Sequence, residues 1–456
     1  MSHEKKQFLE ESAKIAPDKR HRATIKFNIS KYDAAVDRGR KRYSDLALAK
    51  ARASYIKGEA IGQLADYLLE FEKNSQANGA EVIWAEDAHE AIQAVQQILK
   101  ENKASLLVKS KSMTTEEIEL NHHVEAVGVE SLETDLGEYI VQIAGEKPYH
   151  IVTPAMHKSK EDIAELFHEK FDTPEKSTPE YLTSFVRGLL REKFTQAEVG
   201  VTGANFLIAD KGAIALTENE GNAMMTFSFP KIHIVIGGIE KVIPRLQDLG
   251  LMWPLLAAHG TGQQVTVYNS IVSGPKQAGE TDGPEKMYVI LLDNKRSELY
   301  QKDDQFEALK CIRCGACLNA CPIYKNVGGY TYDATYSGPI GSVITPFLKG
   351  FSEYNHLSSA CSVCGKCSEV CPVKIPLHNM LLYNRRDAVE RGDTPALWNM
   401  GMKAFEFAFM KRKRLDLLNG KTKNQLGKLQ QNALGDQKSL PTFAKESFSQ
   451  QWKNKH

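Results

Sequence analysis

All eight cysteines of the chain fall within one short stretch, and they repeat a single spacing twice. The pattern C-x2-C-x2-C-x3-C-P runs from Cys311 to Pro322 and again from Cys361 to Pro372. This spacing is typical of bacterial ferredoxins, in which three neighbouring thiolates hold one 4Fe-4S cluster and the fourth thiolate binds the other cluster. Because no cysteine is left over, the sequence predicts two 4Fe-4S clusters.

Each predicted cluster takes ligands from both halves of the repeat, because the fourth cysteine of each run serves the other cluster. The first ligand set is Cys311, Cys314, Cys317 and Cys371, and the second is Cys321, Cys361, Cys364 and Cys367. Gly315 and Gly365 follow the second cysteine of each run, where the backbone must approach the cluster closely. Two redox centres held this close together are typical of proteins that pass electrons on.

Two other uses of cysteine fit the pattern less well. Zinc sites usually take two separated C-x2-C pairs, whereas three thiolates lie within seven residues here. A disulfide framework requires an oxidising compartment, and the first residues, Met1 to Phe8, lack the apolar core of a signal peptide. Thiols that bind iron also indicate a reducing compartment, so we expect a cytoplasmic protein.

The rest of the chain sets limits on its partners. With 456 residues, it is long enough for about two or three domains. A net charge of +1 gives no reason to expect nucleic acid as a partner. The apolar stretch Leu249 to Ala258 is about half as long as a bilayer span and contains Pro254. The sequence therefore predicts no membrane span, and any membrane association would have to go through a partner.

Composition and periodicity divide the chain into four regions. We expect a basic helical arm at 1–60, an α/β domain at 61–300, a two-cluster domain at 301–410 and a polar tail at 411–456. The arm is expected to face solvent or a partner, because it carries basic runs. The tail is expected to be extended, and its isolated aromatic residues indicate docking on a partner or on the chain itself.

Strands and helices alternate through the α/β domain. Strands are expected at 82–84, 106–108, 127–132, 204–209, 213–217 and 232–236, and helices at 88–99, 114–124, 161–171 and 179–193. Thr114 and Glu117 form a predicted capping box, and Thr178 is the predicted N-cap before Pro179. Helices of this length between strands imply right-handed crossovers and a mainly parallel sheet.

Two acidic segments follow predicted strands. Glu133 to Glu138 comes after the third strand, and Thr217 to Asn222 forms a later turn. Ligands of open α/β sheets bind at the edge where strands end, so Asp135, Glu138 and Glu220 are candidate site residues. If the two segments converge, mutual repulsion would raise the pKa of at least one carboxyl. The alternative is that both are solvated turns rich in turn-forming residues.

Nucleotide-binding motifs are missing from the sequence. No G-x-G-x-x-G follows a predicted strand, and Gly420 to Thr422 lacks the earlier glycine of a P-loop, because Leu415 occupies that position. We therefore expect no dinucleotide or ATP site, although a flavin site without a simple motif stays open.

Four segments carry a resemblance to a known family: Lys109 to Met113, Glu133 to Ile140, His150 to His157 and Thr217 to Asn222. Joined to the duplicated cysteine run, they resemble the LUD-domain iron–sulfur subunits of bacterial lactate utilisation systems. The resemblance implies an α/β LUD domain, related to sugar-phosphate isomerase and CoA-transferase-like domains. It also implies that a helical ferredoxin-type domain with two 4Fe-4S clusters follows.

The resemblance further implies an electron-transfer subunit of a complex that oxidises L-lactate to pyruvate. Its implied partners are a smaller LUD protein and a cysteine-rich subunit similar to those of heterodisulfide reductases. An alternative makes the LUD domain the catalytic site for the 2-hydroxy acid, with Asp135, Glu138 or Glu220 as the acting carboxyl. Lys109, Lys111 and His157 are then the candidates for holding the substrate carboxylate. A third reading makes the LUD domain a docking scaffold.

Overall fold

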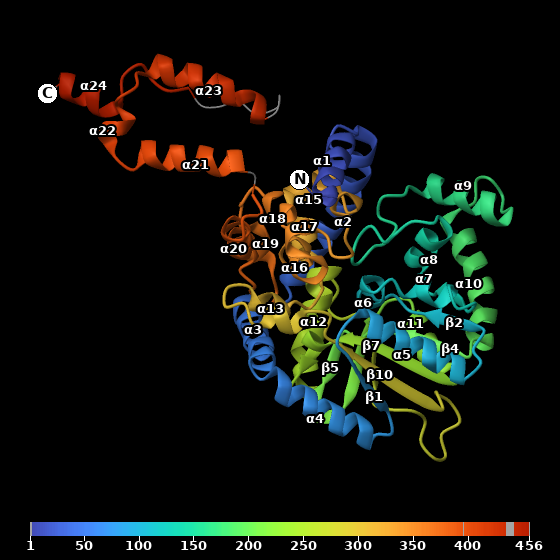
Figure 1. The fold of residues 1–456 in the computed structure, drawn as a ribbon. Coiled ribbons are helices and arrows are strands. Elements are labelled where there is room, and N and C mark those ends of the chain that lie inside the picture. The colour runs from blue at the N-terminus through green and yellow to red at the C-terminus, as the bar shows by residue number, and fades with distance from the viewer. Residues whose placement is uncertain (1, 395, 435–441, 456) are drawn as a thin grey trace. The chain divides into compact units, whose positions relative to one another are not determined.

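The computed structural model describes residues 2–394, 396–434 and 442–455. The chain forms two compact units, Met1–Asp387 and Ala388–His456. The first unit holds every strand that the structure describes and all eight cysteines, and the second is built of helices (Figure 1).

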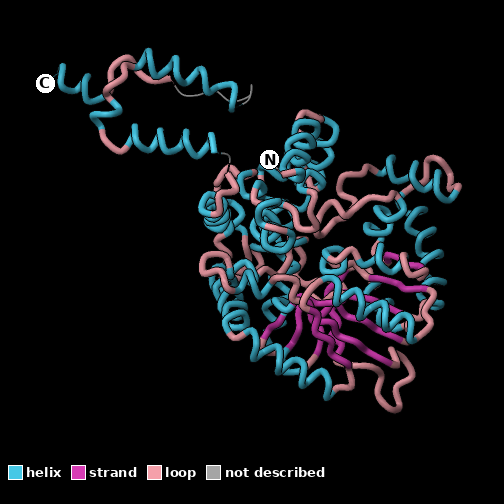
Figure 2. Tube along the Cα trace, viewed as in Figure 1, coloured by secondary structure: helices cyan, strands magenta, loops and turns pink. Residues whose placement is uncertain are grey.

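The main sheet has six strands in the order β1-β10-β7-β4-β2-β3, and every neighbouring pair is parallel. Figure 2 shows the strands, in magenta, gathered among helices. The strands in that order are Glu81–Ala85, Lys286–Leu292, Ile232–Gly238, Val199–Thr202, Leu106–Lys109 and Glu130–Glu133. Every residue of the central strands β7 and β4 is buried, as expected for a parallel sheet covered on both faces. The predicted parallel α/β architecture is confirmed.

Helices cover both faces of this sheet. On one face, α5 (Ala88–Glu101) packs Val95 and Leu99 against strand residues such as Ile234. On the other, α9 (Lys160–Phe171) and α10 (Pro179–Gln196) build a second core. Thr178 caps α10 as predicted, because its side chain accepts a hydrogen bond from Tyr181 N at 3.3 Å.

A second, separate sheet has four strands in the order β8-β5-β6-β9. Its strands are Val242–Ile243, Phe206–Ile208, Ala213–Glu218 and Tyr268–Val272. The sequence predicted β5 and β6 but did not indicate that they leave the main sheet. Because β6 ends at Glu218 and α11 (Asn222–Ser228) begins just after, the second acidic segment becomes the turn between them.

The N-terminal arm is helical as expected, but it is packed rather than solvated. It comprises α1 (His3–Ile15), α2 (Lys19–Arg40) and α3 (Leu46–Gly62), and α4 (Leu64–Ala77) follows. Ile25, Ile29 and Val36 form one buried face of α2, which packs against α12 (Leu249–Gly260). These apolar residues recur at helical spacing between basic residues, so the charge of the arm concealed its buried face.

The cysteine segment is made of short helices. Its helices are α14 (Ala316–Ala320), α15 (Pro322–Val327), α16 (Gly338–Lys349), α17 (Phe351–Tyr354), α18 (His356–Ser359) and α19 (Lys366–Val370), of which α14 and α19 lie within the cysteine runs. The helices α14 and α19, one from each half of the repeat, pack side by side. Before them lies α13 (Arg296–Tyr300), and α20 (Leu377–Glu390) follows.

One predicted helix start is wrong. Ser112, and not Thr114, caps α6 (Met113–Glu117), because the Ser112 hydroxyl accepts a hydrogen bond from Thr115 N at 3.3 Å. The expected single helix also breaks at Glu119, whose φ is +52°, before α7 (Leu120–Glu125). The Glu117 side chain does not close a capping box because it binds Arg296 at 2.7 Å.

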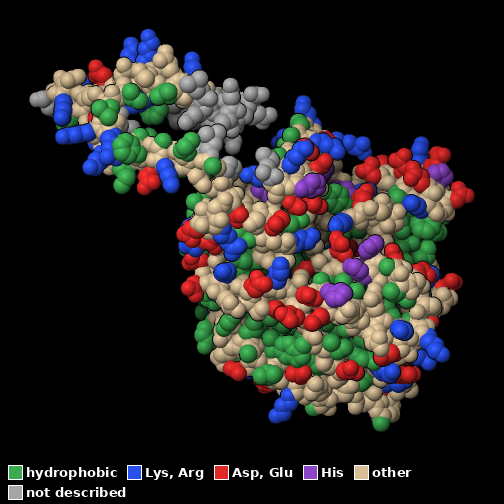
Figure 3. Space-filling model, viewed as in Figure 1, with side chains coloured by type: hydrophobic (Ala, Val, Ile, Leu, Met, Phe, Trp, Pro, Cys, Tyr) green, Lys and Arg blue, Asp and Glu red, His purple; other side chains and the backbone are tan. Residues whose placement is uncertain are grey.

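The second unit corrects the expectation of an extended tail. Its helices are α21 (Ala396–Phe409), α22 (Arg412–Leu415), α23 (Gly420–Leu434) and α24 (Phe448–Lys455). Trp398, Phe405 and Phe448 are exposed, and Figure 3 shows hydrophobic side chains among Lys and Arg over this unit. None of the helices in the described ranges is both long and apolar enough to span a bilayer.

Candidate functional site

The structure gathers the cysteines into two groups that each draw on both halves of the repeat. Cys311, Cys314, Cys317 and Cys371 line one apolar cavity, together with Ile312, Val373 and Ile375. The other four lie near one another: besides burial, the neighbouring Cys361 and Cys364 raise the pKa of the Cys321 thiol. Burial and the nearby Cys361 and Cys321 likewise raise the pKa of Cys367 to about 11.

The two halves follow the same backbone path around their cysteines. Arg313 and Val363 have φ values of +58° and +55°, and Gly315 and Gly365 have +77° and +75°. In each run the left-handed residue two positions after the first cysteine turns its N–H toward sulfur, so that Arg313 N donates to Cys311 Sγ at 3.4 Å. Val363 N donates to Cys361 Sγ at 3.3 Å. Inward N–H groups and apolar surroundings both fit an iron–sulfur cluster.

The two cysteine groups differ in their access to solvent. Cys314, Cys317 and Cys371 are buried, whereas Cys364 is exposed and its neighbour Val363 is 37% exposed. The first group therefore lies in the interior and the second reaches the surface.

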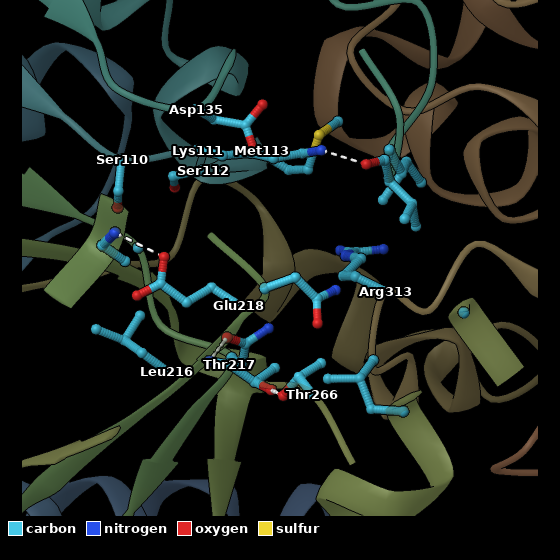
Figure 4. Close-up of a pocket in the computed structure, with 18 of the residues that line it drawn as sticks. Ser110, Lys111, Ser112, Met113, Asp135, Leu216, Thr217, Glu218, Thr266 and Arg313 are labelled. Atoms are coloured by element: carbon cyan, nitrogen blue, oxygen red, sulfur yellow. Dashed lines mark hydrogen bonds between the residues drawn. The ribbon is translucent and has the colours of Figure 1, made fainter. Parts of the chain in front are cut away.

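A cavity of about 280 Å³ lies between the LUD-like sheets and the first cysteine run (Figure 4). Its walls come from the segment after β2, the start of α8 (Leu136–Ile143), the turn after β6, and α12. Arg313 and Cys314 of the cysteine segment complete the lining. The cavity thus joins the α/β domain to the predicted site of the first cluster.

Carboxylates from the two acidic segments form one wall of this cavity. Asp135, Glu218 and Glu220 all line it, and Glu220 Oε2 accepts a hydrogen bond from Leu136 N at 3.4 Å. Burial and the nearby Asp135 raise the pKa of Glu220, and burial raises that of Glu218. The two acidic segments meet at the sheet edge, where burial is the first cause of the raised pKa of Glu220 and repulsion from Asp135 the second.

Glu138, the third candidate carboxyl, lies outside the cavity. Its side chain is buried behind the start of α8, and burial together with Glu133 raises its pKa well above the usual value. Asp135 instead caps this helix, because its carboxylate accepts a hydrogen bond from Glu138 N at 3.0 Å.

Lys241 and Arg313 form a basic wall. The Arg313 guanidinium lies 4.4 Å from the Tyr336 ring centre, and Nη2 donates to Glu240 Oε1 at 3.1 Å. Its Nε and Nη1 are buried without a hydrogen-bond partner among the described residues. Lys241 is 8% exposed, and burial with the adjacent Arg313 lowers its pKa to about 8. Because buried donors are nearly always paired, the free Arg313 N–H groups are available to an acceptor bound in the cavity.

The three cations proposed from the sequence have different positions. Lys111 lines the cavity, and its Nζ donates to Val152 O at 2.6 Å. Lys109 is fully buried between Glu116 at 2.8 Å and Glu133 at 2.6 Å, so its charge is already compensated. His157 lies elsewhere and pairs with Glu146 at 2.8 Å. Only Lys111 of the three is therefore placed to meet a ligand in the cavity.

Sequence reasoning missed both residues of the basic wall. Arg313 is one of the two residues between Cys311 and Cys314, and the cysteine motif does not specify the residue type at that position. Lys241 lies in a short 3-10 turn (Ile239–Lys241) after β7, which no motif marks. The two consecutive glycines at the end of β7, Gly237 and Gly238, were the available signal, because glycine at a strand end often marks a close approach.

A buried ionic network supports the basic wall. Arg296 binds Glu117 at 2.7 Å and Glu240 at 2.5 Å, and Tyr336 donates to Glu117 at 2.6 Å. Lys57 Nζ donates to Glu240 O at 2.6 Å and to Val242 O at 3.0 Å, and burial lowers its pKa to about 7.

The charges in this network do not balance. Among the described residues, the carboxylates beside Arg296, Arg313 and Lys241 are those of Glu117 and Glu240, which leaves one positive charge in excess. The Cys311 thiolate also lies near Arg313 and Lys241. Lys57 adds to the excess whenever it is protonated. A buried charge without a partner is costly, so an anion is expected beside this network.

Comparisons with known proteins give consistent results. Residues 68–292 match the LUD domain and residues 307–375 match the 4Fe-4S dicluster domain. Lactate utilization protein B of Bacillus pumilus (strain SAFR-032) is 45% identical over 352 residues, which cover 77% of this chain and 74% of that protein. The protein of the same name from Bacillus thuringiensis (strain Al Hakam) is 44% identical over 351 residues, with the same coverage of 77% and 74%.

A solved structure of a DUF162 family protein from Deinococcus radiodurans also matches. It is 14% identical, covers 50% of this chain and 98% of its own, and has a TM-score of 0.29. At that score the likeness carries no argument.

Proposed function

Because the chain belongs to the lactate utilisation protein B family and has a role in lactate utilisation, we propose that it is the electron-transfer iron–sulfur subunit of a complex oxidising L-lactate to pyruvate. In the cell this activity would enable growth on L-lactate. The observation that carries the proposal is the placement of the eight cysteines in two groups, one interior and one at the surface.

The proposed ligands follow these groups. Cys311, Cys314, Cys317 and Cys371 would hold the first 4Fe-4S cluster, and Cys321, Cys361, Cys364 and Cys367 the second. When bound, each cluster can take up and release one electron. The chain supplies N–H donors to the sulfurs and, around the first group, a shell that includes Ile312 and Val373 and excludes water.

The proposed partners are a smaller LUD protein and a cysteine-rich subunit similar to those of heterodisulfide reductases. The exposed side of Cys364 and Val363 supports exchange with such a partner, since electrons cross short distances between proteins most readily. We place the complex in the cytoplasm, with any contact to a membrane made through a partner.

A second candidate function makes the cavity the site of lactate oxidation. The specific observation in its favour is that Cys314, a proposed cluster ligand, lines the same cavity as Asp135 and Glu220. Oxidation of lactate to pyruvate releases two electrons and two protons, and a carboxyl with a raised pKa is a suitable proton acceptor. Glu220 has such a pKa, and Lys111 beside it would orient the substrate.

The experiment that tests both candidates is lactate-dependent cluster reduction in the anaerobically reconstituted complex. Wild-type protein is compared with Asp135→Asn and Glu220→Gln, and the visible absorbance of the clusters is followed after L-lactate is added. If the complex contains the clusters but lactate never reduces them, the electron-transfer proposal fails. Slower reduction in both variants, at unchanged iron content, supports catalysis in the cavity. Equal rates in all three proteins leave this chain an electron carrier.

A further inference from the structure

We propose that the cavity binds the carboxylate of a small 2-hydroxy or 2-oxo acid through Arg313 and Lys241, and that this binding opposes reduction of the adjacent first cluster. The inference rests on the proposed role in lactate oxidation and adds a specific ligand site to it. It also adds a coupling between ligand binding and redox state.

The first support is the unused hydrogen-bonding capacity of the basic wall. Arg313 is nine-tenths buried, yet its Nε and Nη1 have no partner in the part of the chain that the structure describes. Nε–H and Nη1–H lie on different edges of the guanidinium, so each can donate one separate hydrogen bond to a ligand, while Nη2 donates to Glu240. Lys241 lines the same cavity and makes no ion pair within the described ranges. Together these groups offer a site for one anionic end of a ligand.

The second support is the opposite wall, which selects among anions. Asp135, Glu218 and Glu220 would repel a doubly charged phosphate, whereas the neutral hydroxyl or keto group of a small acid can lie beside them. Burial raises the pKa of Glu220, which lines the cavity, so this carboxyl can also donate a hydrogen bond while protonated. A cavity of about 280 Å³ suits a ligand of a few heavy atoms. The chemistry therefore points to a short monocarboxylate.

The third support is that the basic wall belongs to two sites at once. Arg313 lines the cavity and also the apolar pocket of Cys311, Cys314 and Cys371. The thiolate of Cys311 acts electrostatically on Arg313 and on Lys241. One reduction adds a negative charge to a cluster, and a bound carboxylate places another negative charge against the same cations. The two anions therefore compete for the same positive charge.

This competition has a necessary thermodynamic consequence. If a carboxylate binds the oxidised protein more tightly than the reduced protein, binding must lower the reduction potential by the same free energy. A tenfold difference in affinity corresponds to ~59 mV for one electron. After electrons have entered, the site holds the carboxylate less tightly, which favours release of the product acid.

The test uses full-length, anaerobically purified protein with both clusters, and pyruvate as the probe. Calorimetry measures pyruvate binding to the oxidised and the dithionite-reduced protein, and EPR-monitored titration gives the cluster potentials with and without pyruvate. We expect about tenfold tighter binding to the oxidised protein and a fall of ~59 mV in one of the two potentials. Arg313→Gln should weaken binding at least tenfold and abolish this fall, and Arg313→Lys should restore part of both.

Lys241→Met provides a second variant, in case Arg313→Gln lowers the iron content. It should also weaken pyruvate binding and reduce the pyruvate-dependent fall in potential. Lys50→Met is the matched control. Lys50 feels the thiolate of Cys371, but its Nζ binds Glu369 O at 2.7 Å and it does not line the cavity. The Lys50→Met substitution should lower the reduction potential of the first cluster by the same amount with and without pyruvate.

Three outcomes would overturn the inference: no pyruvate binding, equal affinity in both redox states, or unchanged binding in both Arg313→Gln and Lys241→Met. These outcomes are distinct from failure of the proposed function. A complex whose clusters are reduced by lactate, although this chain binds no carboxylate, keeps the function and loses the inference. If pyruvate binds and shifts the reduction potential, but lactate never reduces the clusters of the complex, the inference is kept and the proposed function is lost.

Discussion

Glu138 is a carboxyl that the fold holds in an unfavourable setting. It is buried, its Oε1 has no partner among the described residues, and burial with Glu133 raises its pKa. A raised pKa in the folded state means that its contribution to stability is present at low pH and is lost as the pH rises through the folded-state value.

We therefore expect Glu138→Gln to raise the free energy of unfolding at neutral and alkaline pH. The gain should be about 1–3 kcal/mol, the usual cost of an unsatisfied buried group, and should disappear toward the ordinary glutamate value of 4.5. Urea denaturation at a series of pH values measures this. A gain that is the same at every pH would contradict the explanation.

Lys109 shows the opposite situation, a buried cation whose partners are fully engaged. Lys109→Met should cost about 3–5 kcal/mol of unfolding free energy, because Glu116 and Glu133 lose their shared cation. Lys147→Met is the matched control: its pair with Glu119 is exposed on both sides, so its loss should cost less than about 1 kcal/mol. Chemical denaturation of both variants provides the comparison, and equal losses would rule out a structural role specific to Lys109.

Individual residues were predictable where a motif fixes both their type and their spacing. The eight cysteines and the acidic residues Asp135 and Glu220 could be proposed from the sequence. Arg313 and Lys241 could not, because their role depends on a contact between segments that are far apart in the chain. Lys109 was proposed as a substrate ligand, but it is committed to Glu133, which the sequence places one strand away.

At the scale of elements, the packing of α14 against α19 brings Cys371 to the cavity of the first cysteine run, which supports the proposed exchange of the fourth ligand. We expect Cys371→Ser to disturb the cluster held by the first cysteine run, and Cys321→Ser to disturb the one held by the second. The exposed second site should lose iron fastest to a chelator. The rate of this fast iron loss should be unchanged in Cys371→Ser and altered in Cys321→Ser. The reverse result would mean that each run closes its own cluster.

The alternation of strands and helices was enough to predict a parallel sheet, but not its full membership. β4 was overlooked because it is short and contains Gly200, where a Cβ atom would lie 1.8 Å from Thr226 O. That contact with α11 requires glycine, so a weak strand former stands in a central strand. β10 was missed although its apolar run is clear, and it pairs between β1 and β7. Its position depends on pairing with β1, a strand about 200 residues earlier in the chain, which local sequence patterns do not indicate.

At the scale of the whole molecule, all proposed cluster ligands and the cavity lie in the unit Met1–Asp387. A chain ending at Gly392, just after α20, should therefore keep about eight irons and its pyruvate affinity. It should lose association with partners, because the helices that expose Trp398 and Phe448 are gone. Iron analysis and co-purification measure the two properties separately. Loss of iron would show that the second unit is needed to hold the clusters.

The meeting of Cys371 with the first cysteine run also makes each cluster a cross-link. A link that closes a loop of roughly fifty residues removes enough freedom from the unfolded chain to contribute ~4 kcal/mol. Iron supply would then decide whether the segment from Cys311 to Cys371 keeps its shape. Because Arg313 and Cys314 of that segment form part of the cavity wall, a cell starved of iron would lose the proposed acid-binding site together with the proposed electron carrier.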